Sequence, residues 1–143
     1  MIRVPPVVRA AALVALVCAV ALPALAQPAA SYKNGSEFYL AYRVAFDKAT
    51  SIDELLPWVA RERREVISKA PAAERKEGFE MMKMFDDRRS VKVVRETPSA
   101  TGAELQVEGV SAESQAKATG VITLLKEDGA WKIVRESWKG GGR

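Results

Sequence analysis

Two segments rich in β-branched and aromatic residues decide the fold class: ATGVITLL at residues 118–125 and WKIVRESW at residues 131–138. Between them lies the turn KEDGA at residues 126–130, in which a glycine follows an aspartate. An Asp-Gly pair between two such segments indicates a β-hairpin, because glycine adopts a positive φ without steric cost. An isolated hairpin is only marginally stable in water, so the sequence predicts further strands and a covering helical layer.

Two shorter segments upstream also have the two-residue period of strands. The first is VKVVRE at residues 91–96, and the second is ELQVE at residues 104–108, where polar and apolar residues alternate. The connections between the four expected strands are too short for parallel crossovers. We therefore expect a four-stranded antiparallel meander.

Helical periodicity precedes the strands. Ser36 is expected to cap a first helix that presents Tyr39, Tyr42 and Phe46 on one apolar face. The capping-box pattern SIDE at residues 51–54 predicts a short second helix. Pro57 fits the first position of the next helix.

The third helix is expected from Trp58 to Lys69, with Val59, Val66 and Ile67 facing inward, and the fourth from Ala72 to Arg88. The fold class is thus α+β, with N-terminal helices packed on an antiparallel sheet. The expected organisation is a flexible lead at 27–35, a single domain at 36–139 and a frayed tail at 140–143.

Residues 1–26 have the pattern of a secretory signal. Arg3 and Arg9 precede an uncharged apolar run at residues 10–22 that is too short to span a bilayer, and the sequence ALA at 24–26 is a cleavage site. We expect cleavage after Ala26, a periplasmic or secreted protein, and no stable membrane anchor after cleavage.

The chain has one cysteine, Cys18, and no histidine. A lipoprotein anchored through Cys18 fits less well than cleavage after Ala26, because Val17 stands where such sites need a small residue. The mature chain would then have neither thiol nor imidazole. That excludes disulfides, thiolate nucleophiles, Ser-His-Asp triads and zinc held by cysteine or histidine, and no cofactor is expected.

The charge balance of the expected mature chain is nearly neutral. Removing Arg3 and Arg9 from the 22 basic residues leaves 20, against 18 acidic residues, which gives a net charge of +2. A chain of this charge has no electrostatic footprint for a polyanion, so we expect no nucleic-acid partner.

The order of helices and strands resembles the nuclear transport factor two-like superfamily, and small exported bacterial members in particular. The resemblance rests on the first helix at 38–46, on SIDELLP at 51–57, and on DGAWKIV at 128–134. It implies a cone in which a curved sheet wraps against helices, with a pocket at the open end and frequent dimerisation through the sheet. Members include isomerases, dehydratases, ligand-binding domains and scaffolds, so the fold does not select the function.

The candidate pocket residues are the large aromatic and thioether side chains. Trp131 and Trp138 are seven residues apart, which in a regular strand puts them on opposite faces of the sheet. The one that does not lie under the helices would line a pocket, cover a dimer interface or be partly exposed. The full set of pocket candidates is Tyr39, Tyr42, Phe46, Trp58, Met82, Phe85, Trp131 and Trp138.

Two chemical alternatives remain open at the level of sequence. A carboxylate in an apolar pocket can act as a general base, and Asp47, assisted by Tyr42 or Tyr39, is the candidate for such an enzyme. Met81 and Met84, three residues apart, suit Cu(I) as soft ligands, but the ligand set is incomplete and packing between helix and sheet explains these methionines better. No metal site is therefore expected.

The function expected from the sequence is non-catalytic. It is either the binding of a small apolar ligand inside the cone or the binding of an extracytoplasmic protein partner on the sheet, with a homodimer as one form of the latter. The alternative is a cofactor-free lyase or isomerase. An enzyme should bury a carboxylate beside an open pocket, whereas an interaction domain should leave an apolar sheet face uncovered.

Overall fold

The computed structural model describes residues 32–86 and 88–140. The expected signal at 1–26, most of the lead and the end of the tail lie outside this part of the chain. The helices are α1 (Gly35–Lys48), the 3₁₀ helix η1 (Ile52–Trp58), α2 (Arg61–Lys69) and α3 (Ala72–Phe85), and the strands are β1 (Arg88–Pro98), β2 (Gly102–Ser111), β3 (Lys117–Glu127) and β4 (Ala130–Gly140). In the described ranges, no helix combines the length and the apolar character needed to cross a membrane.

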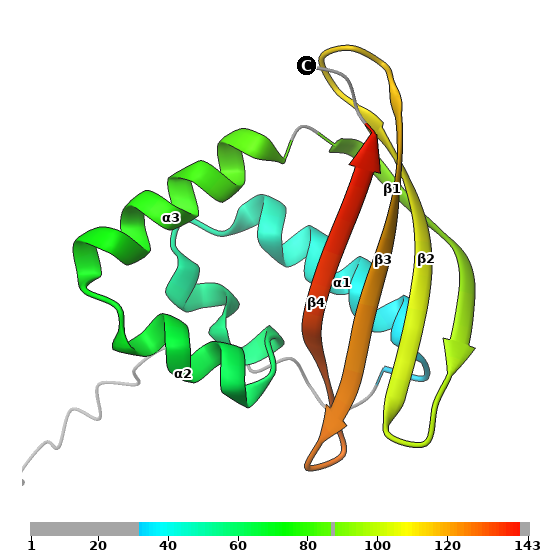
Figure 1. The fold of residues 1–143 in the computed structure, drawn as a ribbon, viewed down its shortest axis with the longest axis horizontal. Helices are drawn as coiled ribbons and strands as arrows, with labels where there is room; N and C mark the ends of the chain where they lie inside the picture. Colours follow the sequence, from blue (N-terminus) through cyan, green and yellow to red (C-terminus); the bar gives the residue numbers. More distant parts are fainter. Residues whose placement is uncertain (1–31, 87, 141–143) are drawn as a thin grey trace, which may run out of the picture.

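The four strands form one antiparallel sheet in the order β1-β2-β3-β4, which confirms the predicted meander and the α+β class (Figure 1). The hairpin between β3 and β4 turns through Asp128 and Gly129, both with positive φ. The sheet is not closed, because β1 and β4 are its two edges.

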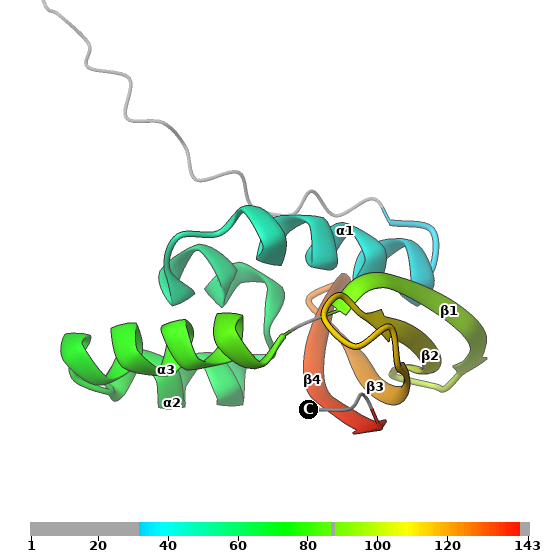
Figure 2. The same cartoon turned by 90° about the horizontal axis from the view of Figure 1, so that it is seen from above.

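Helix α1 covers one face of the sheet, and α2 and α3 lie beside the β4 edge (Figure 1, Figure 2). The core forms where the aromatic face of α1 meets the inward residues of the strands, and it includes Phe38, Tyr39, Leu105, Ile122 and Ile133. None of the helices formed by the described residues covers the face of the sheet opposite α1 (Figure 1, Figure 2).

Two glutamates of the sheet cap the helices that adjoin it. The carboxylate of Glu96 in β1 accepts hydrogen bonds from the backbone N–H groups of Gly35 (2.9 Å) and Ser36 (3.0 Å) at the start of α1. Glu127 in β3 accepts from the backbone N–H of Arg61 (2.8 Å), the first residue of α2. A carboxylate at these positions satisfies otherwise unpaired N–H groups and complements the helix dipole.

The prediction that Ser36 caps α1 is therefore wrong. The N-cap is Asn34, whose side chain accepts from the Glu37 N–H (2.8 Å), while the Ser36 hydroxyl donates to Glu96. Ser36 lies inside the helix and helps to hold Glu96.

The third helix begins at Arg61, and not at Trp58 as the sequence indicates. Pro57 lies inside η1, and the chain then extends so that the Ala60 N–H donates to the Ile133 carbonyl (2.9 Å). This contact joins the end of η1 to β4, so that α2 can begin only at Arg61. Val66, predicted to face inward, is 68% exposed, because α2 extends away from the sheet.

The prediction that Trp131 and Trp138 lie on opposite faces is also wrong. The register between β3 and β4 shifts at Thr123/Leu124, which leaves Val134 as an extra residue in β4. Such a β-bulge resets the alternation of side chains. Both tryptophans consequently lie on the helix side, packed against the core.

Candidate functional site

The predicted pocket residues converge, but they fill the space between helix and sheet themselves. Tyr39, Tyr42, Phe46 and Trp58 are buried, and Met82, Trp131 and Trp138 pack against them. Neighbouring rings lie 5.5–6.2 Å apart, between Phe38 and Trp58 and between Tyr42 and Phe46, for example. These spacings are typical of packed aromatic clusters.

The space left within this aromatic cluster is small. A cavity of about 10 Å³ remains, bordered by Tyr42, Arg63 and Met82. A cavity of this size is at the lower limit for a single water molecule. The space between α1 and the sheet is therefore occupied by the protein's own side chains in this conformation.

One carboxylate lies within the cluster, and it is Glu136 of β4. The hydroxyl of Tyr39 donates to Glu136 Oε1 at 2.8 Å. Burial raises the pKa of the Glu136 carboxyl group, although the hydrogen bond from Tyr39 and the charge of Arg43 oppose the increase. Burial and the neighbouring charge of Glu136 also raise the pKa of Tyr39, so Tyr39 is a hydrogen-bond donor throughout the physiological range.

A second buried pair lies beside it. Arg43 of α1 contacts Asp86, the C-cap residue of α3, with 2.7 Å between Nη1 and Oδ2. The pKa of the Arg43 guanidinium is raised overall. Burial alone would lower this pKa, but the hydrogen bond and the charge of Asp86 outweigh the effect of burial. Burial, followed by the charge of Glu136, raises the pKa of Tyr42. The pair joins α1 to the end of α3.

Asp47, the carboxylate chosen from the sequence, is not part of this cluster. Its side chain is 68% exposed, and its nearest ion-pair atom, Arg43 Nη2, is 4.0 Å away. Asp47 occupies the last turn of α1, where the chain leaves the sheet, so it lacks the apolar surroundings that a general base requires.

The end of α3 also departs from expectation. Phe85, a predicted pocket residue, is exposed, as are Met81 and Met84. Packing accounts for Met82, which contacts the core, but for neither of the other two methionines. Across the described ranges, no group of three or more His, Cys, Asp or Glu residues is placed to hold a metal ion.

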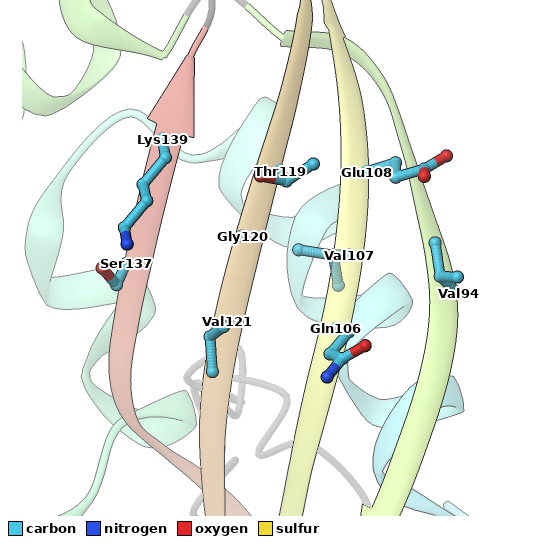
Figure 3. Close-up of a pocket in the computed structure, with 9 residues that line it drawn as sticks. All are labelled: Val94, Gln106, Val107, Glu108, Thr119, Gly120, Val121, Ser137 and Lys139. Carbon is cyan, nitrogen blue, oxygen red and sulfur yellow. The ribbon is translucent and has the colours of Figure 1, made fainter.

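The uncovered face of the sheet carries a hollow of about 320 Å³ (Figure 3). It crosses all four strands and is lined by Val94 of β1, Gln106 of β2, Val121 of β3 and Ser137 of β4, among others. Val94 is 53% exposed and Val121 is 41% exposed, so two β-branched apolar side chains are in contact with solvent here. A second hollow of about 230 Å³ shares Glu108 and Thr119 with the first.

Basic side chains outnumber acidic ones on this face among the described residues. The strand register places them on the same side as Gln106, Thr119 and Val121. The basic residues are Lys92, Arg95, Lys117, Lys132, Arg135 and Lys139, and the acidic residues are Glu104, Glu108 and Glu127. The uncovered face therefore combines an apolar centre with a largely cationic surround.

Sequence analysis missed both features. In a regular strand, Glu136 would share a face of the sheet with Val134 and Trp138, and Ile133 would lie on the other face. Only the bulge at Val134 brings Glu136 onto the face that α1 covers. The hollow on the outer face depends on sheet curvature, which the alternation of ELQVE does not encode. The exposed position of Val94 follows from a further register shift, between Val93 and Arg95 in β1.

Comparisons of the chain with protein-family models, with curated proteins and with solved structures find no match.

Proposed function

We propose that this protein is an exported, non-catalytic interaction domain of the nuclear transport factor two-like type, and that it binds a protein partner on the uncovered face of its sheet. The observation that carries the proposal is the hollow of about 320 Å³ between Val94, Val121 and Ser137. Soluble domains seldom leave apolar side chains exposed in a hollowed surface without a binding role.

The charges on this face favour an acidic partner. Lys139 of β4 lines the hollow, Lys117 of β3 lines the second hollow beside it, and Arg135 lies on the same face of β4. Charge complementarity between docking surfaces increases the association rate and suppresses wrong partners. A second copy docked by the same face would bring basic groups against basic groups, so the proposed partner is a different protein, with carboxylates around an apolar contact.

The alternative function, a cofactor-free lyase or isomerase, has one observation in its favour. Glu136 and Tyr39 form a buried carboxyl–phenol pair, a combination that can transfer protons. Tyr39 already occupies the carboxylate, and the cavity of about 10 Å³ beside Tyr42 is lined by neither member of the pair and has no room for a substrate. The interaction role is therefore better supported.

Substitution on the uncovered face tests the proposal. Val121→Asp should leave the fold intact, because Val121 is already in contact with solvent, and should weaken binding of the natural partner by about tenfold or more, since it places a charge in an apolar contact. Lys139→Glu should weaken binding further, and more strongly at low salt. The measurement is quantitative co-purification, followed by titration of the purified partner.

Val66→Asp provides the matched control. It makes the same chemical change at an exposed valine of α2, away from the sheet. Equal loss of binding in Val66→Asp and Val121→Asp would contradict the assignment of the outer face, as would a partner that binds both variants like the wild type.

A further inference from the structure

A separate hollow of about 510 Å³ lies between the α1–η1 connection and α3. Its lining includes Ile52, Asp53, Arg75, Lys76, Phe79 and Lys83. Its volume is within the range of small-molecule sites in proteins, roughly 300–1,000 Å³. None of its lining residues lies on the sheet.

The floor of this hollow is apolar. Phe79 is the buried anchor of α3, only 6% exposed, and Ile52 beside it is buried at the start of η1. Lys83 is already engaged, because its Nζ donates to the carbonyls of Phe46 (2.8 Å) and Asp47 (3.0 Å) at the end of α1. Lys83 therefore fixes one wall of the hollow by joining α3 to α1.

The opposite wall presents a cationic donor that has an ion-pair partner but no hydrogen bond. Arg75 Nε is shielded from solvent and makes no hydrogen bond within the described residues. It forms a long ion pair with Asp53 Oδ1, 3.5 Å away, and the Nη1 group of Arg75 donates to the carbonyl of Ala70 (3.2 Å). A buried donor without an acceptor is costly, and an anionic oxygen that reached it would recover that cost.

The geometry points to a binding site for a small amphipathic anion in this hollow, with its apolar body against Phe79 and Ile52 and its anionic group beside Arg75 and Lys76. A carboxylate on a medium-length alkyl chain has this chemistry. The cationic lining residues Arg75, Lys76 and Lys83 outnumber the acidic ones, Asp53 and Glu80, which disfavours a cationic ligand. This site is independent of the partner proposed for the sheet.

Amide chemical-shift mapping of the ¹⁵N-labelled protein with sodium decanoate tests the inference. Saturable shifts are expected at residues around the hollow, including Ile52, Asp53 and Phe79. Decyltrimethylammonium, which has the same chain length and the opposite charge, should bind about tenfold more weakly. Equal binding of the two compounds, shifts confined to the sheet at Thr119 and Val121, or no saturable shift at millimolar decanoate would overturn the site.

Two substitutions separate the role of charge from that of folding. Arg75→Gln should weaken decanoate binding by about tenfold. Because Arg75 also ties the α2–α3 connection through Ala70, Lys76→Gln serves as an independent variant, with an expected loss of about threefold, as the side chain is exposed. Lys69→Gln on α2 makes the same charge change away from the hollow and should leave the affinity unchanged. A similar loss in all three variants would indicate nonspecific charge attraction and overturn the site.

Discussion

Glu136 places an ionisable carboxyl group under α1, among the aromatic side chains of the core. Its hydrogen bond from Tyr39 compensates in part for the loss of water, but burial still raises its pKa above the ordinary value of 4.5. The folded state therefore holds the proton more tightly than the unfolded chain. Stability contributed by the protonated group is fully present below the unfolded pKa and is lost as the pH rises through the folded pKa.

Glu136→Gln should remove this pH dependence. The amide oxygen of glutamine can still accept from Tyr39, whereas the amide carries no charge to bury. We expect the free energy of unfolding of the variant, relative to wild type, to increase as the pH rises above about 4.5, with a slope of at most about 1.4 kcal/mol per pH unit. Urea unfolding of both proteins across pH 4–8 measures this difference in the free energy of unfolding. A constant difference between the two proteins over this range would contradict the account, and the exposed Glu104→Gln is the control.

Glu96 behaves in the opposite way. Burial alone would raise its pKa, but the hydrogen bonds from Ser36 and Gly35 outweigh burial and lower it. The stabilisation is therefore present above the unfolded pKa, near 4.5, and is lost as the pH falls through the folded pKa.

Glu96→Gln should reduce the free energy of unfolding by about 1 kcal/mol at pH 7, the usual cost of losing a helix cap. The difference should shrink as the pH falls below about 4.5, because the unfolded chain then takes up a proton at Glu96 more readily than the folded protein does. Denaturant titrations at pH 7 and pH 3 compare the two conditions. If the loss is as large at pH 3 as at pH 7, the charge of Glu96 is not what caps α1.

At the scale of the elements, the bulge in β4 decides which side chains reach the core. Val134 is the extra residue, and it brings Glu136 and Trp138 onto the same face as Ile133. Trp138 then lies opposite Gly120 of β3, where a Cβ atom would come within 2.8 Å of the indole ring. The tryptophan, the glycine and the bulge thus depend on one another.

Deletion of Val134 should restore strict alternation and turn the end of β4 over. Glu136 and Trp138 would then leave the helix side, and the core would lose a large aromatic contact, at a cost of about 3 kcal/mol or more. Val134→Ala keeps the bulge and should cost less than about 1 kcal/mol, because the side chain is exposed. Unfolding curves and the ¹⁹F resonance of 5-fluorotryptophan at position 138 report both effects. A deletion variant that keeps the native resonance would show that the bulge does not set the register.

Some features of these elements can be predicted from the sequence, and others cannot. The Asp128-Gly129 turn and the two-residue periods predict the meander, because both are local signals, and helical periodicity predicts α1 for the same reason. The caps are different, because Glu96 acts on Gly35 from 61 residues away. The bulge has no local signature either, since Ile133 and Val134 are both apolar and either could face inward. Glu136 could not be predicted from the sequence for that reason.

At the scale of the whole molecule, the helices and the sheet leave two surfaces with different chemistry. The outer face of the sheet is broad, basic and apolar at its centre, around Val94 and Val121. The hollow beside Phe79 lies between the α1–η1 connection and α3, and combines an apolar floor with cationic side chains. The core between them is filled by side chains, so binding is expected at the surface.

Zero-length carbodiimide crosslinking in the producing cells, followed by mass spectrometry of the linked peptides, tests the proposed docking face most directly, because this reagent joins lysine amines to carboxylates in contact. The account predicts links from Lys92, Lys117 and Lys139 on the outer face to aspartate or glutamate residues of one other protein. Lys69 and Lys76 on the helical hairpin should form no such links. Links between two copies of this chain through the sheet, links from the hairpin lysines alone, or the absence of intermolecular links would contradict it.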